Sequence, residues 1–197
     1  MSSVVISGDT SGAITLAAPA VAGTNTITLP ASTGTVLVAG TASAIVSGTA
    51  VATTSGTAIT FTSIPSWVKR ITMVFNGVST SGSSYPVLRI GSGSVDSTSY
   101  VSSSTVCYGA NLASITSTSS YVIYNDVASN ALSGSIELNN VSGNIWIASG
   151  VFSMYAANAT VILGGTHTIS GTLDRVQLTT INGTDTFDAG SVNILYE

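Results

Sequence analysis

The sequence predicts an all-β protein: an antiparallel β-sandwich or jelly-roll-like domain with an extended N-terminal β-arm. Three observations predict this class. Charged residues make up only 6% of the 197 residues, so the helix formers Lys and Glu are nearly absent. Thr and Val, which suit strands, are abundant. Short apolar runs recur about every ten residues between turns rich in Gly, Asn and Ser, and no segment has the pattern of an amphipathic helix.

Residues 1–40 form the predicted arm. Two alternating runs, Gly12–Leu16 and Asn25–Leu29, are followed by Pro19 and Pro30 respectively, and a third run follows at Thr35–Val38. Asp9 is the only charged residue in this segment. Two or three short strands are marginal in isolation, so we expect the arm to pair with copies of the chain or with a partner protein. The alternative is a flexible tether, which the abundance of Val, Ile and Leu disfavours.

Residues 41–56, rich in Gly, Ala, Ser and Thr, are the predicted linker, and residues 57–197 are the predicted β-sandwich. Asn76-Gly77 and Asn182-Gly183 are turn signals, and residues 110–116 hold one helical turn at most. About eight strands are expected in the domain. Their cores are Ile71–Phe75, Val87–Ile90, Tyr121–Tyr124, Ile136–Leu138, Ile145–Ile147, Val161–Leu163, Leu173–Ile181 and Ser191–Tyr196. The last run is apolar on both faces, which predicts a strand buried on both sides.

The charge pattern excludes several classes of partner. The net charge is −4 and no basic run exceeds two residues, so we expect no nucleic-acid binding. No stretch of about 20 residues has the composition of a spanning helix, which predicts no membrane span. The first residues lack a basic segment and a continuous apolar core, so no signal peptide is expected and folding in a cytoplasm is the simplest interpretation. Cys107 is the only cysteine, so the chain forms no internal disulfide.

The residues that could carry chemistry are few, and we expect no catalytic, metal or cofactor site. His167, the only histidine, is interpreted as a strand or loop residue, because no nucleophile elbow accompanies it. Cys107 is interpreted as a small core residue. The acids considered for glycoside hydrolysis are Glu137, Asp174, Asp185 and Asp188. Strand alternation places Asp174 and its neighbour Arg175 on opposite faces. The other two aspartates follow a turn and are expected to bond to local backbone N–H groups.

Tyrosines in the Ser- and Gly-rich connections are the candidate contact residues. Tyr85, Tyr100 and Tyr155 are the candidates for contact with glycan or protein, because tyrosine offers an apolar face and a polar tip. The alternative for each is packing in the core or between subunits. Trp67 and Trp146 are predicted to anchor the core.

The N-terminal segment resembles a known family. Gly8–Leu16 together with Ala18–Val36 resembles a segment that recurs in virion proteins of tailed bacteriophages, often tail-fibre-like ones. The remainder, from Ile59–Pro65 to Phe187–Glu197, looks like the β-rich domain that often accompanies this segment. The similarity covers most of the chain. It implies a virion structural protein of a tail fibre, head fibre or capsid decoration, and it brings no active-site motif.

The sequence therefore predicts a non-enzymatic virion surface protein of the fibre or spike type. Residues 1–40 would attach it to other virion proteins, and the β-domain would be displayed, with adhesion to host-surface glycan as the expected role. We expect a homo-oligomer, most simply a homotrimer, which would multiply weak contacts by avidity. A capsid decoration protein that stabilises the head is the alternative within this class. A polysaccharide depolymerase and a bacterial adhesin are the alternatives from other classes.

Overall fold

The computed structural model describes residues 3–7, 13–17 and 45–197, and the chain divides into two compact units, Met1–Ala42 and Ser43–Glu197. In the first unit, β1 (Ser3–Ser7) pairs with β2 (Ala13–Ala17) in antiparallel register. The second strand coincides with the first predicted run of the arm. The runs predicted at residues 25–29 and 35–38, and most of the predicted arm, lie outside the described residues.

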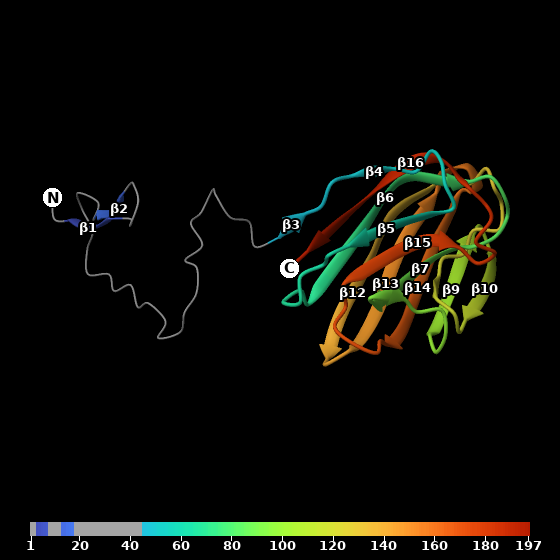
Figure 1. The fold of residues 1–197 in the computed structure, drawn as a ribbon. Helices are drawn as coiled ribbons and strands as arrows, with labels where there is room; N and C mark the ends of the chain where they lie inside the picture. The colour runs from blue at the N-terminus through green and yellow to red at the C-terminus, as the bar shows by residue number, and fades with distance from the viewer. Residues whose placement is uncertain (1–2, 8–12, 18–44) are drawn as a thin grey trace. The chain divides into compact units, whose positions relative to one another are not determined.

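The second unit is an antiparallel β-sandwich, which confirms the predicted fold class (Figure 1). Its larger sheet has nine strands in the order β10-β9-β14-β13-β12-β6-β16-β3, with β4 also paired to β16. The bounds are β3 Val46–Ser47, β4 Val51–Ala52, β6 Arg70–Thr80, β9 Val101–Tyr108, β10 Asn111–Ser117, β12 Leu132–Ser142, β13 Ile145–Met154, β14 Ala159–Thr168 and β16 Phe187–Tyr196. In this sheet each described pairing is antiparallel.

The smaller sheet has five strands in the order β11-β7-β15-β5, with β8 paired to β7. It covers one face of the larger sheet and lies in front of it in Figure 1. The bounds are β5 Ala58–Thr62, β7 Pro86–Ser92, β8 Ser94–Val95, β11 Tyr121–Val122 and β15 Arg175–Thr180. One 3-10 helix, η1 (Tyr155–Ala157), joins β13 to β14. The sandwich of the second unit therefore has two layers with its core between them.

The core follows from strand alternation. On β6 the side chains of Ile71, Met73 and Phe75 are buried and their neighbours are not, as the predicted alternation requires. Phe75 packs edge-on against Phe152 of β13, with ring centroids 4.9 Å apart. Each such side chain contributes roughly 1.5–3 kcal/mol when fully buried, so this inner layer dominates the stability of the sandwich.

The predicted turn at Asn76-Gly77 is wrong, because β6 continues through it to Thr80. The register of β6 shifts opposite both β12 and β16, so this segment is a β-bulge in a long strand. Gly77 has φ +65°, and a Cβ on Gly190 of β16 would lie 2.4 Å from the Gly77 carbonyl oxygen. The close approach of two glycines replaces the hairpin that the sequence indicated.

The predicted linker over residues 41–56 is also wrong in its C-terminal part. The short strands β3 and β4 both pair with β16. The Gly48 and Thr53 amides donate to the carbonyl oxygens of Ile194 and Gly190, at 2.7 and 2.9 Å, and Thr53 is fully buried. Small residues suit this segment because its backbone lies close along β16. Residues 45–56 belong to the sandwich.

Three smaller predictions also need correction. Residues 111–117 form the strand β10 rather than a helical turn. Trp146 is buried as predicted, but Trp67 is 53% exposed and packs its ring against Tyr196 instead of the core. On β16, Val192 and Ile194 are buried on the inner face, whereas the outer-face Leu195 is only half-buried, so this strand is not buried on both sides.

Candidate functional site

The loops that carry Tyr85, Tyr124 and the exposed Tyr155 gather at one end of the sandwich. Strand register places them there, because the residues that flank these loops are paired with one another across the large sheet. The pairs are Phe187 with Thr80, Leu132 with Val78 and Met154, Ala159 with Met154 and Tyr108, and Asn111 with Tyr108. We call this the loop end, and it consists of residues 81–85, 109–110, 123–131, 155–158 and 181–186.

Tyr155 is the most exposed of the large apolar and aromatic side chains in the described part of the chain, at 88%. It begins the short helix η1, which Asn158 caps in the left-handed conformation, and the Asn158 amide donates to the Tyr155 carbonyl oxygen. Asparagine tolerates this conformation better than most residues, so the turn is tight and projects the ring from the tip. The structure thus places Tyr155, a predicted contact residue, on an open surface.

Tyr85, the second predicted contact residue, is half-buried at the same end. Its ring packs against that of Tyr124, with centroids 5.3 Å apart and an angle of 66° between the planes. The Tyr124 hydroxyl donates to a carboxylate oxygen of Asp126 at 3.1 Å. Desolvation and the neighbouring carboxylate raise the pKa of Tyr124 to about 12, so this phenol stays protonated at neutral pH.

Tyr100 is not a surface contact, because it is only 1% exposed. Its hydroxyl accepts a hydrogen bond from the Ile90 amide at 2.9 Å and faces the Ile90 and Asp96 carbonyl oxygens as acceptors. Burial raises the pKa of this phenol well above its ordinary value. The alternative interpretation, core packing, is therefore correct for Tyr100. The sequence did not reveal this difference, since Tyr85 and Tyr100 lie in similar Ser-rich surroundings.

His167 lies on the inner face of β14 and is buried, which confirms its interpretation as a strand residue. Its ring stacks on Tyr100 with centroids 3.7 Å apart and an angle of 8° between the planes. Nε2 lies 3.0 Å from a carboxylate oxygen of Asp96, and Nδ1 lies 3.3 Å from the Ser99 carbonyl oxygen. Both nitrogens are thus engaged in holding the 96–100 segment against the sheet.

The chemistry of the loop end resembles that of known recognition loops. Its segments are composed largely of Ser, Gly, Asn, Ala and Tyr, and their charged residues are Asp126 and Asp185. Tyrosine gives a rigid contact area at low entropic cost, and Ser, Gly and Asn give adaptable hydrogen bonds, as in antibody loops. These segments contain no Lys or Arg, so an uncharged ligand suits them better than a phosphate or a carboxylate.

The four acids considered for hydrolysis have different surroundings. Asp185 accepts hydrogen bonds from the Ser84 amide at 3.0 Å and from the side-chain amide of Asn182 at 2.7 Å, which joins two distant loops. Asp188 accepts from the Ser79 hydroxyl. The prediction of purely local backbone bonding is therefore wrong for both aspartates, and Asn182 fills that role instead. Glu137 lies mid-strand on the outer face of β12, away from these loops.

Asp174 and Arg175 are paired, contrary to the prediction from alternation. The Arg175 Nε and a terminal nitrogen donate to the two carboxylate oxygens of Asp174 at 2.7 and 3.1 Å. Alternation fails because β15 begins at Arg175, so Asp174 is not a strand residue. The hydrogen bond from Arg175, together with one from the Gly93 amide, lowers the pKa of Asp174. This carboxylate is thus committed to a structural ion pair.

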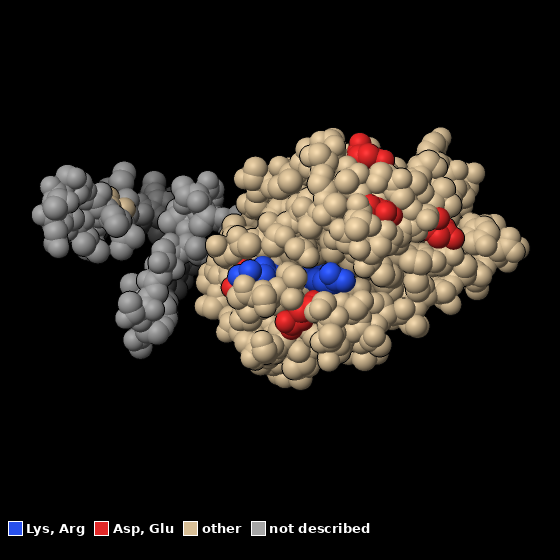
Figure 2. Space-filling model, turned by 45° about the vertical axis from the view of Figure 1, so that its right-hand side comes forward, with Lys and Arg blue, Asp and Glu red and all other residues tan. Residues whose placement is uncertain are grey.

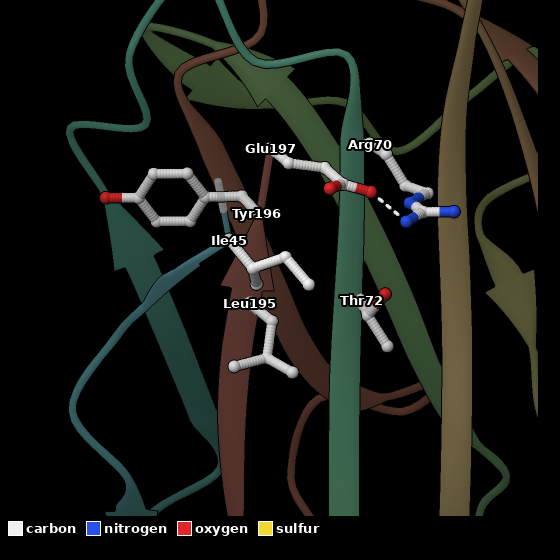
Figure 3. Close-up of a pocket in the computed structure, with 6 residues that line it drawn as sticks. All are labelled: Ile45, Arg70, Thr72, Leu195, Tyr196 and Glu197. Atoms are coloured by element: carbon white, nitrogen blue, oxygen red, sulfur yellow. Dashed lines mark ion pairs between the residues drawn. The ribbon is translucent and has the colours of Figure 1, made fainter. Parts of the chain in front are cut away.

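A shallow depression of about 40 Å³ lies at the opposite end of the sandwich, between Ile45 and the C-terminal residues. Figure 3 shows the Arg70–Glu197 ion pair on one side of it and the Ile45 and Leu195 side chains on the other. Typical ligand pockets measure about 300–1,000 Å³, and a water needs roughly 10–15 Å³. The depression therefore fits a few waters rather than a substrate.

The exposed surface is nearly uncharged, and Figure 2 shows only scattered acidic and basic groups on the visible face. Cys107, predicted as a core residue, lies instead on the outer face of β9 and is partly exposed, because its neighbours Val106 and Ser104 point inward. Among the described residues, no group of three His, Cys, Asp or Glu side chains is arranged to hold a metal ion. Within the same residues, no helix is long and apolar enough to cross a membrane.

Comparisons with protein-family models, with curated proteins and with solved structures found no match to this chain.

Proposed function

We propose that this chain is a non-enzymatic surface protein of a tailed-phage virion, made in the host cytoplasm and assembled on the particle as a fibre- or spike-type component. Residues 1–40 attach it to other virion proteins, and the sandwich is displayed. Identical copies assemble, with a homotrimer as the simplest state. Neutral glycan on the host surface is the ligand class that best suits the loop end, because Tyr155 is exposed there, Tyr85 is half-buried, and the segments contain no Lys or Arg.

One observation carries the proposal: the chain enters the sandwich at the end opposite to the exposed tyrosines. Val46 pairs with Tyr196, and Tyr196 pairs with Ile71, whereas Thr80 at the other end of β6 borders the loop end. The 11 residues of β6 span about 35 Å at the usual rise of a strand. A domain held from its entry point would therefore present Tyr155 and Tyr85 outward, which supports display.

The first experiment locates the chain. Antibodies raised against the sandwich are applied with gold label to intact virions purified from the source of the sequence. We expect label on the outer surface of the particles. Recovery of the chain only in the soluble fraction of the lysate, with unlabelled virions, would overturn the proposal.

A second experiment separates adhesion from the alternatives. Full-length protein is incubated with lipopolysaccharide and capsular polysaccharide purified from the host, and both retention and new reducing ends are measured. The adhesive role predicts retention that Tyr155→Ala and Tyr85→Ala each weaken, while Val141→Ala at the opposite end, 60% exposed, leaves it unchanged. Absence of retention would favour capsid decoration. New reducing ends would favour a depolymerase.

A further inference from the structure

The outer face of the large sheet is uncharged, and large apolar side chains stand exposed on it among Ser and Thr. We define the outer face as the residues of β9, β10, β13 and β14 that point away from the smaller sheet. These four strands contain no Asp, Glu, Lys or Arg residue. On this face the side chains of Val151 and Ile162 are 56% and 52% exposed, and those of Val101 and Leu112 are 69% and 71% exposed. An antiparallel sheet with one wet face normally alternates apolar and polar residues, so this face differs from an ordinary surface.

The register of the strands gives this face a ridge and a furrow. Val151 of β13 lies opposite Ile162 of β14, and these two residues form a ridge. Two residues along each strand, Ser149 lies opposite Gly164, and Gly164 lies opposite Ser103 of β9, which forms a furrow of small residues. The next row is bulky again. It consists of Ile147, Thr166 and Val101.

Successive rows of side chains on one face lie two residues apart along a strand, about 6.7 Å, so ridge and furrow alternate at this spacing. A ridge of one copy therefore matches the furrow of another copy of the same face. Self-complementary shape is the requirement for an interface between identical subunits related by a two-fold axis. The shape of the outer face thus points to one particular occupant, a second copy of this chain.

The size of the face and its lack of charge agree with this occupant. Strands lie about 4.8 Å apart and rise about 3.3 Å per residue, so four strands with the flanking β12 cover roughly 700 Å². A standard protein interface buries about 800 Å² on each partner. Two chains of net charge −4 repel one another over most of their surfaces. β9, β10, β13 and β14 add no like charge to the contact, and the charged residue on the outer face of the flanking β12 is Glu137, opposite Ser149 at the margin of the face.

The free edge of the sheet provides a separate observation. β10 is the edge strand next to β9 and has no other strand partner in the described sheet. Its residues, Asn111–Ser117, contain no charge and no proline, and its pairing with β9 has no register shift. Soluble proteins usually protect an edge strand with a charged residue, a proline or a β-bulge. The absence of all three is expected where the edge is shielded in an assembly.

We propose that the outer face packs against the same face of a second copy of this chain, with the ridge at Val151 and Ile162 of each copy in the furrow at Gly164 of the other. This contact joins two copies through the sandwich itself. The contact depends neither on residues 1–40 nor on the position of the chain in a virion. The inference therefore goes beyond the proposed function.

Gly164→Val is the most selective test, because it fills the furrow without straining the fold. A Cβ at Gly164 meets only the Ala148 carbonyl oxygen, at an ordinary contact distance of 3.8 Å, and valine favours strands. Ile162→Lys is the second variant, since it places an unpaired charge in the contact. Val127→Lys, at a 47% exposed position of the loop end, is the matched control.

The measurement is the mass of the full-length chain by sedimentation equilibrium over a range of micromolar concentrations, with melting temperatures recorded alongside. We expect the wild type and Val127→Lys to reach an even multiple of the 19.7 kDa chain mass. Gly164→Val and Ile162→Lys should raise the dissociation constant of the pair by about a hundredfold or more while the protein stays folded. A monomeric wild type, or a trimer whose mass neither variant changes, would overturn this inference. A monomeric wild type would also contradict the homo-oligomer of the proposed function, whereas a trimer that neither variant changes would agree with it. Display on the virion is tested separately by the labelling experiment.

Discussion

Val151 on β13 and Ile162 on β14 are cross-strand neighbours on the outer face of the large sheet, and both are more than half exposed. The adjacent residues Phe152 and Val161 are fully buried on the inner face. The two strands are thus apolar on both faces at this point, a pattern typical of strands covered on both sides. The exposed pair is the strongest structural reason to regard this chain as part of an assembly.

Tyr100→Phe should destabilise the sandwich by about 1–3 kcal/mol, because it leaves the buried Ile90 amide without its acceptor. Urea unfolding followed by circular dichroism measures the change. Tyr155→Phe is the control, since its hydroxyl lies on an open surface and its removal should change the free energy of unfolding by less than about 0.5 kcal/mol. Equal effects of the two substitutions would contradict the structural role assigned to Tyr100.

Gly190→Ala should cost much more stability than Gly77→Ala, although both glycines have positive φ angles of +91° and +65°. A Cβ at Gly190 would clash with backbone atoms of residues 76 and 77, whereas nothing lies within 4 Å of a Cβ at Gly77. We expect roughly 3 kcal/mol or more for the first substitution and about 1–2 kcal/mol for the second. Thermal unfolding of the two variants gives the comparison, and a reversed order would refute the bulge described here.

The N-terminal boundary of the sandwich can be tested by truncation. Removing residues 1–42 should leave a folded β-domain with almost the same melting temperature. Removing residues 1–56 should cost at least about 3 kcal/mol, because it deletes β3, β4 and the backbone hydrogen bonds made by Gly48, Thr53 and Gly56. Identical melting temperatures for the two truncated proteins would show that residues 45–56 are a linker and would contradict their assignment to the sandwich.

Stability should fall at alkaline pH. Burial raises the pKa values of Tyr100 and Tyr121 in the folded state above the ordinary value of about 10. These phenols therefore ionise in the unfolded chain first, so their contribution is fully present below pH 10 and declines as the pH rises above it. Each contributes a slope of up to about 1.4 kcal/mol per pH unit. Urea unfolding at pH 8 and pH 11 measures the loss, and Tyr121→Phe should reduce the slope.

Much of the fold could be predicted from the sequence, because alternation is a local property. The runs around Met73, Ile90 and Val192 became strands of the sandwich at the expected places. Features that depend on distant residues could not be predicted. Asn76-Gly77 has the residues of a hairpin turn, but pairing with β12 and β16 on both sides keeps the strand continuous. The small residues of the predicted linker similarly pair with β16, about 140 positions further along the chain.

The candidate site was predictable only in part. Two of the three candidate tyrosines, Tyr85 and Tyr155, lie at the loop end, and their role as contact residues stays a prediction. Tyr100 is instead buried, with its hydroxyl bonded to Ile90 on a different strand. The outer face was missed, although the sequence contains a signal for it. No charged residue occurs between Glu137 and Asp174, so the strands in this interval lack charge on the face that a sheet ordinarily turns to water.

The central claim is that the sandwich is displayed on a virion by its entry end, and electron cryo-microscopy of intact particles tests it most directly. We predict density for the sandwich on the outer surface, with residue 45 and Tyr196 toward the particle and Tyr155 pointing away from it. Density that places Tyr155 against the particle, or particles that contain no such domain, would contradict the account.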